Sequence, residues 1–136
     1  SEYHIDGFRF DLMGVLDIET LNEARKALLK INPDIIMYGE GWTGGESTLP
    51  ESERGMKINA PRTPGIGMFS DDIRDAVKGH VFYMDELGFV NGAADRGEEL
   101  KQAVTCAKWA KSPMQSINYL SCHDNYTLWD RFIIFT

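Results

Sequence analysis

Short apolar runs alternate along this chain with stretches whose apolar residues recur at helical spacing. Residues 4–11 largely alternate apolar and polar side chains, which is the period of a β-strand. Residues 35–38 are continuously apolar, as strands buried on both faces of a parallel sheet are. Between these runs, residues 18–31 place apolar side chains three and four apart, which indicates an amphipathic helix. Strand, helix and strand in this order predict a βαβ unit and an α/β fold.

The rest of the chain repeats this pattern. Residues 20–23 have the form of a helix capping box, with Asp17 as a competing cap, and Pro33 follows the helix end. Residues 41–67 are rich in Gly, Pro, Ser and charge, and are too long for a plain connector, so we interpret them as a functional excursion. The later elements are predicted as strands at 66–69 and 116–120, helices at 71–78 (capped by Ser70) and 98–111, an ambiguous stretch at 80–97, and a loop entering a last helix over 124–132.

Composition excludes several classes of function. The net charge of −7 argues against nucleic acid, whose phosphates require clustered Lys and Arg, and is compatible with a neutral ligand such as a sugar. The chain has no apolar run of about 18 residues, so no membrane-spanning helix is expected. Cys106 and Cys122 fit no metal or disulfide spacing and are interpreted as free thiols, which favours the cytoplasm, with secretion as the alternative.

Three of the predicted strands run into acidic residues. The first ends at Asp11, the second at Glu40, and the fourth leads into His123 and Asp124. Groups just past the carboxyl ends of parallel strands face the ligand in α/β folds, so these acids are expected to converge. A single acid at a strand end is more often a cap or a solvated charge; only the convergence points to a site.

Two close carboxylates suit the hydrolysis of a glycosidic bond with retention of configuration. One attacks the anomeric carbon, while the other protonates the leaving oxygen and later activates water, at a carboxylate separation of about 5 Å. Arg9 lies two residues before Asp11, on the same strand face. Its permanent charge is expected to favour the ionised form of Asp11 that a nucleophile needs.

Three segments resemble conserved regions of the α-amylase superfamily of glycoside hydrolases, in the right order. They are Asp6-Gly7-Phe8-Arg9-Phe10-Asp11, Tyr38-Gly39-Glu40-Gly41-Trp42 and Tyr119-Leu120-Ser121-Cys122-His123-Asp124-Asn125. Four segments are similar to type I pullulanases, a debranching subfamily: residues 11–14, 40–42, 64–71 and 123–130. The resemblance covers nearly the whole chain.

The resemblance implies a (β/α)8 TIM barrel and hydrolysis of α-1,6 branch linkages in pullulan, amylopectin or glycogen. By position, Asp11 would be the nucleophile, Glu40 the general acid/base and Asp124 the second acid, which holds sugar hydroxyls. Substrate-binding roles would fall to Arg9, His123, Trp42 and Asn125, with a core position as the equal alternative for Trp42. No cofactor and no metal are expected. Trp109 is assigned to the core, from its place on the stripe of the predicted helix 98–111.

The chain is shorter than a whole barrel, which typically takes about 250 residues. Its four predicted strands match strands four to seven, so residues 1–136 are expected to be an incomplete domain that begins in mid-protein. An open half-barrel exposes strand edges and an apolar face, so we expect the isolated polypeptide to associate with itself. Two functions stay open: the catalytic segment of a debranching hydrolase, or a truncated, non-catalytic domain with at most weak carbohydrate binding.

One further pair of residues, Cys122 and His123, matches the residue types of a Cys-His nucleophile. Adjacent residues on a strand point to opposite faces, so this pair is not expected to work together.

Overall fold

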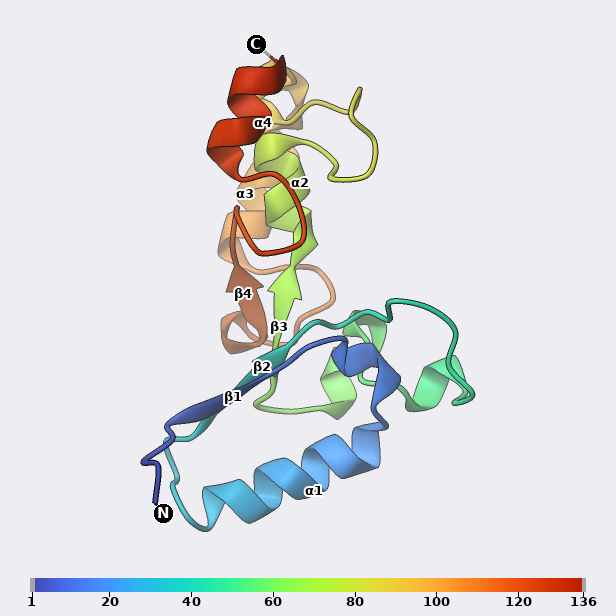
Figure 1. The fold of residues 1–136 in the computed structure, drawn as a ribbon, viewed down its shortest axis with the longest axis vertical. Coiled ribbons are helices and arrows are strands. Elements are labelled where there is room, and N and C mark those ends of the chain that lie inside the picture. The colour runs from blue at the N-terminus through green and yellow to red at the C-terminus, as the bar shows by residue number, and fades with distance from the viewer. Residues whose placement is uncertain (1, 136) are drawn as a thin grey trace. The chain divides into compact units, whose positions relative to one another are not determined.

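The computed structural model describes residues 2–135 and shows an α/β arrangement (Figure 1). Short 3-10 turns connect many of the elements. In chain order the strands and α-helices are β1 (Gly7–Phe10), α1 (Ile18–Leu29), β2 (Ile36–Gly39), β3 (Gly67–Ser70), α2 (Asp71–Lys78), α3 (Gly97–Thr105), β4 (Ser116–Asn118) and α4 (Leu128–Phe135). The predicted order of elements is confirmed, with strand bounds that shift by up to a few residues.

The chain forms two compact units, which we describe one at a time. The first unit comprises the residues up to Phe69 together with Trp109–Gln115, and the second comprises Ser70–Lys108 together with residues 116–135. No helix within residues 2–135 combines the length and apolar character that crossing a membrane requires.

The first unit contains a parallel sheet, as the βαβ pattern predicts. β1 pairs with β2 in a register that places Phe10 beside Gly39, and β2 pairs with β3 with Gly39 beside Met68. Because neighbouring parallel strands run in the same direction, their carboxyl ends meet at one edge of the sheet. The residues that follow Phe10 and Gly39 therefore leave the sheet side by side.

The core of this unit lies between α1 and the sheet. Leu21 of α1, Met37 of β2 and Met68 of β3 are each at most 2% exposed and form one apolar cluster with Met13 and Ile66. Alternation along β2 explains the burial, since Met37 faces the helix whereas Ile36 points away and is 59% exposed. The apolar stripe of α1 thus fixes which face of the sheet is covered.

The start of α1 differs from the predicted capping box. Asp17 is the N-cap, because its Oδ1 accepts a hydrogen bond from the backbone N–H of Thr20 at 2.7 Å. The helix begins at Ile18, so Thr20 already lies in its first turn and is not free to act as the cap.

The core of the second unit lies between α2 and α3, which pack against each other (Figure 1). Ile73 and Val77 of α2 meet Ala103 of α3, and Leu120 and Leu128 close the cluster. Ser70 occupies the predicted N-cap position of α2, but it makes no side-chain capping bond, and its buried Oγ has no partner among the described residues. The acidic first turn, Asp71 and Asp72, suits the positive end of the helix dipole instead.

Helix α3 ends six residues before the predicted end at 111. The hydroxyl of Thr105 bonds back to the carbonyls of Lys101 and Gln102, and Cys106 is extended, so the helical turn stops there. Trp109 therefore does not lie on a helical stripe. It packs, partly buried, against the apolar cluster of the first unit, so its assignment to a core is confirmed for a different reason.

Candidate active site

Asp11 and Glu40 emerge from neighbouring strands at the same height. Asp11 follows Phe10 of β1 and Glu40 follows Gly39 of β2, and these two preceding residues are paired in the sheet. The backbone N–H of Glu40 donates to the carbonyl of Phe10 at 3.0 Å, which extends the ladder by one residue. The strand pairing therefore holds the two acids next to each other.

Arg9 joins the two carboxylates. Its Nη1 lies 2.5 Å from Asp11 Oδ1, and its Nη2 lies 2.7 Å from Glu40 Oε1. Oxygens of the two carboxylates lie within 4.8 Å of each other. The planar guanidinium carries its donors in a fixed fork, so one side chain sets the position of both acids. The predicted grouping of Arg9 with Asp11 is confirmed, and Glu40 belongs to the same group.

The two acids differ in exposure. The side chain of Asp11 is 62% exposed, whereas that of Glu40 is 2% exposed. The backbone N–H of Leu12 donates to Glu40 Oε2 at 2.7 Å, so both oxygens of Glu40 have a donor. Leu12 makes this bond from a left-handed conformation with φ of 44°, which costs a non-glycine residue about 1–2 kcal/mol. Strained backbone of this kind gathers at functional sites.

Trp42 is tied to this group through Gly14. The N–H of Gly14 donates to the carbonyls of Glu40 and Trp42, at 3.2 and 3.1 Å. A Cβ on Gly14 would lie 2.5 Å from the Trp42 carbonyl, so only glycine permits this approach. The Trp42 ring is half-buried, and the Lys57 ammonium lies 6.0 Å from its centroid. Trp42 therefore sits beside the two acids with its ring partly accessible.

The other candidates lie in the second unit, on the loop between β4 and α4. His123 Nε2 is 3.1 Å from Asp124 Oδ1, and His123 Nδ1 is 3.1 Å from Cys122 Sγ. These contacts fit an imidazole that accepts from the thiol at Nδ1 and donates to Asp124 from Nε2. The argument that Cys122 and His123 point apart is wrong, because β4 ends at Asn118 and strand alternation does not reach them.

Asn125 is held by a residue that sequence analysis did not single out. Its Oδ1 accepts a hydrogen bond from Lys78 Nζ at 2.9 Å, and the same ammonium donates to the carbonyl of Tyr126 at 2.7 Å. Lys78 is 1% exposed, and burial lowers the pKa of its ammonium, with the charge of Arg74 acting in the same direction. No sequence signal announces this role, because a lysine at a helix end is ordinarily solvated.

The structure thus brings the predicted residues together in two groups. Arg9, Asp11, Glu40 and Trp42 form one group in the first unit. His123, Asp124 and Asn125 form the other in the second unit. Neither Cys106 nor Cys122 forms a disulfide, as predicted. The meeting of Asp124 with Asp11 and Glu40 stays a prediction.

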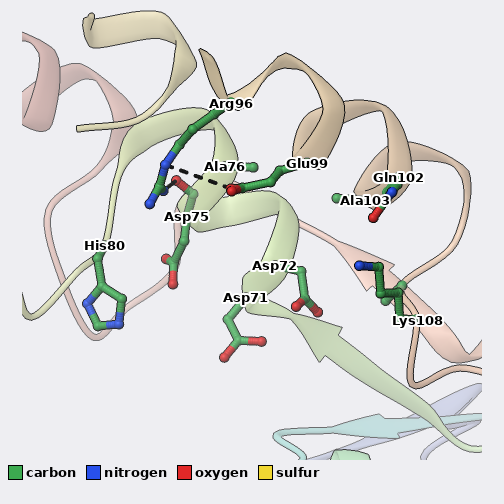
Figure 2. Close-up of a pocket in the computed structure, with 11 residues that line it drawn as sticks. Asp71, Asp72, Asp75, Ala76, His80, Arg96, Glu99, Gln102, Ala103 and Lys108 are labelled. Atoms are coloured by element: carbon green, nitrogen blue, oxygen red, sulfur yellow. Dashed lines mark hydrogen bonds and ion pairs between the residues drawn. The ribbon is translucent and has the colours of Figure 1, made fainter. Parts of the chain in front are cut away.

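A separate cavity of about 300 Å³ lies between α2 and α3 (Figure 2). None of the seven predicted site residues is among the described residues that line it. Its acids have structural partners: Asp75 pairs with Arg74 at 2.7 Å, and Glu99 lies 3.8 Å from Arg96. Asp71 and Asp72 belong to the first turn of α2. The carboxylates around this cavity are therefore accounted for by helix packing.

Comparison with known proteins finds several that are similar to the chain. No protein-family model matches it. The pullulanase of Bacillus subtilis strain 168 is 41% identical over 138 residues, an alignment that covers 96% of this chain and 19% of that protein. The chain is therefore similar to this pullulanase over nearly all of its own length, while it spans about a fifth of that protein's length.

Crystal structures of pullulanases share the fold. The enzyme of Paenibacillus barengoltzii, in complex with maltohexaose and alpha-cyclodextrin, matches with 48% identity and a TM-score of 0.86, over 96% of this chain and 21% of that one. The enzyme of Anoxybacillus sp. LM18-11, in complex with maltotetraose, matches with 45% identity and a TM-score of 0.92, over 98% of this chain and 20% of that one.

Proposed function

We propose that this chain is part of the catalytic (β/α)8 barrel of a pullulanase-like hydrolase, contributing barrel strands four to seven. The proposed activity is the hydrolysis of α-1,6 branch linkages in α-glucans, with retention of configuration. The observation that carries the proposal is the pair of carboxylates, Asp11 and Glu40, at the ends of adjacent parallel strands and bridged by Arg9. Their spacing, within 4.8 Å, fits the separation of about 5 Å in retaining enzymes.

In the first step, a carboxylate oxygen of Asp11 attacks the anomeric carbon of the branch glucose. The bond from that carbon to the glycosidic oxygen breaks, and Glu40 gives its proton to the leaving oxygen. Asp11 suits the attack because its side chain is open to solvent. Both oxygens of Glu40 are held, by Arg9 and by the Leu12 N–H, so one of these contacts must be exchanged for the glycosidic oxygen.

In the second step, water resolves the covalent glycosyl-enzyme. Glu40 removes a proton from the water while the water oxygen bonds to the anomeric carbon. The bond between that carbon and Asp11 then breaks. Asp124 and Asn125 hold sugar hydroxyls, His123 orients Asp124 through its 3.1 Å contact, and Trp42 packs against a sugar ring.

The relatives crystallised with maltooligosaccharides support a linear or branched α-glucan as ligand. The free thiols Cys106 and Cys122 favour a reducing compartment, the cytoplasm.

The test is an assay of the complete protein that carries this chain. We expect it to release maltotriose from pullulan, and we expect the 136-residue chain alone to do so poorly, since it spans about a fifth of its relatives. Binding of maltooligosaccharides without any hydrolysis by the complete protein would favour the non-catalytic alternative. Hydrolysis by the short chain at the rate of the complete protein would contradict the expectation that the chain alone is a poor catalyst.

We also propose that the isolated chain self-associates through its apolar surface. Several large apolar side chains are more than half exposed in each unit: Tyr3, Ile31 and Ile36 in the first, and Phe82, Trp129 and Ile133 in the second. Burial of these side chains against a second copy would remove apolar area from water, which favours association. Light scattering at micromolar concentration is expected to give a dimer or larger species; a stable monomer would contradict the proposal.

A further inference from the structure

Helix α2 carries two buried cations, four residues apart, that both contact the loop between β4 and α4. Arg74 is 7% exposed and Lys78 is 1% exposed. Residues four apart lie on one face of a helix, about 6 Å from each other along the axis. The loop they contact carries His123 and Asp124 and passes beside α2 (Figure 1).

Arg74 holds the start of the loop. Its Nη1 donates to the hydroxyl of Tyr119 at 2.7 Å, while Nε and Nη2 bond to the two carboxylate oxygens of Asp75 at 2.7 and 3.1 Å. The Tyr119 ring also lies under the guanidinium, 5.7 Å from ring centroid to Cζ. Burial raises the pKa of Tyr119 to about 12, so the phenol stays neutral and accepts from Arg74 throughout the working pH range.

Lys78 holds the end of the loop. Its ammonium donates to Asn125 Oδ1 and to the Tyr126 carbonyl, and no carboxylate forms an ion pair with it within residues 2–135. The hydrogen-bond acceptors of this ammonium are neutral, so its burial is costly even though the charge of Asp75 favours it. The Lys78 carbonyl is itself fixed by Arg131 Nε at 3.2 Å and Asn91 Nδ2 at 3.3 Å, which makes the end of α2 a rigid support.

We propose that Arg74 and Lys78 are positioning residues: together they clamp both ends of the loop and thereby hold Asp124 in its working place. Between Tyr119 and Asn125, Leu120 packs against the apolar cluster of α2 and α3, the Leu128 N–H donates to Ser121 Oγ, and His123 contacts its two neighbours. Both His123 and Asp124 are 55% exposed, so packing does not fix them. The proposal rests on the role proposed above for Asp124.

The decisive variant is Lys78→Met, which keeps a long side chain but removes both hydrogen bonds. In the complete protein we expect kcat for pullulan to fall about 100-fold, because a displacement of about 1 Å in a catalytic group has this effect. KM should rise less than kcat falls, since of the proposed sugar contacts only those of Asp124 and Asn125 depend on the loop. Lys101→Met is the matched control, because its side chain is 74% exposed and, among the described residues, its ammonium pairs with Glu98 on the surface of α3; it should leave kcat unchanged.

A double variant separates positioning from a general loss of stability. In an Asp124→Asn background the extra loss from Lys78→Met should disappear, because there is no longer a carboxylate to place. The same fold-loss in both backgrounds would overturn the proposal. If Lys78→Met does not fold, Lys78→Gln, which retains an amide donor, should give a smaller loss of kcat with the same dependence on Asp124.

Hydrogen exchange tests the clamp without reference to activity. Lys78→Met should raise exchange at the amides of residues 121–127, with exchange in the β1–β2 ladder unchanged; equal rates in the loop would overturn the clamp. If the complete protein hydrolyses no α-glucan, the proposed function fails, and this measurement still decides whether Lys78 holds the loop.

Discussion

Asp11→Asn in the complete protein is expected to lower kcat for pullulan by about 10⁴-fold or more, because the amide cannot form the glycosyl-enzyme bond. Glu40→Gln is expected to cost about 10²–10⁴-fold, the usual contribution of a general acid/base. The two losses differ in kind. A substrate whose leaving group needs no proton should restore bond cleavage in Glu40→Gln, but not in Asp11→Asn.

Glu46→Gln is the matched control for both variants. Glu46 is an exposed acid in the same excursion after β2, so the change removes one charge without touching the two carboxylates, and turnover should stay within about twofold. Near-normal activity in either Asp11→Asn or Glu40→Gln would remove that residue from its proposed step. Measurement of kcat and KM with each substrate, on protein shown to be folded, provides the comparison.

Arg9→Met is expected to destabilise the protein by about 3 kcal/mol and to reduce turnover as well. Glu40 is 2% exposed and receives one of its two hydrogen bonds from Arg9, so the variant leaves a buried carboxylate with only the Leu12 N–H. Removal of one partner of a buried ion pair typically costs about 3–5 kcal/mol, and the 29% exposure of Arg9 places this pair at the low end. Urea unfolding of the folded variants measures the loss directly.

Lys101→Met again supplies the contrast, since both side chains of its ion pair with Glu98 are more than 70% exposed. Exposed pairs contribute about 0–1 kcal/mol, so the midpoint of unfolding should hardly move. Arg9→Lys should fall between the two variants, because an ammonium is a compact charge and cannot present the fork that reaches both carboxylates. Equal unfolding midpoints for Arg9→Met and Lys101→Met would refute the claim that the Arg9–Glu40 ion pair stabilises the protein.

The closeness of Asp11 and Glu40, with Arg9 beside Asp11, could be predicted from the sequence. Periodicity located β1 and β2, and the parallel pairing of adjacent strands then required their terminal acids to be neighbours. Periodicity could not show that the Arg9 guanidinium contacts Glu40 as well as Asp11. Whether one guanidinium reaches two carboxylates depends on how far along the sheet each strand ends, and this is set by the register of the strands.

Lys78 lay beyond sequence reasoning for a different reason. A lysine in the last turn of a helix ordinarily meets solvent and complements the dipole. Its burial comes from a loop 47 residues later in the chain, and no local pattern encodes that contact. The contact between Cys122 and His123 escaped notice in the same way, because strand alternation was applied to residues that lie past the end of β4.

The left-handed backbone at Leu12 raises the question of why a leucine occupies a position that glycine would tolerate at lower conformational cost. The side chain supplies the answer: a Cβ on Gly44 would meet Leu12 Cδ1 at 2.9 Å, so the turn after Trp42 rests directly on this leucine. One residue therefore couples two motifs, with its N–H directed to Glu40 and its methyl groups beneath the neighbouring turn. A glycine at position 12 would relieve the backbone but remove the side chain on which this turn rests.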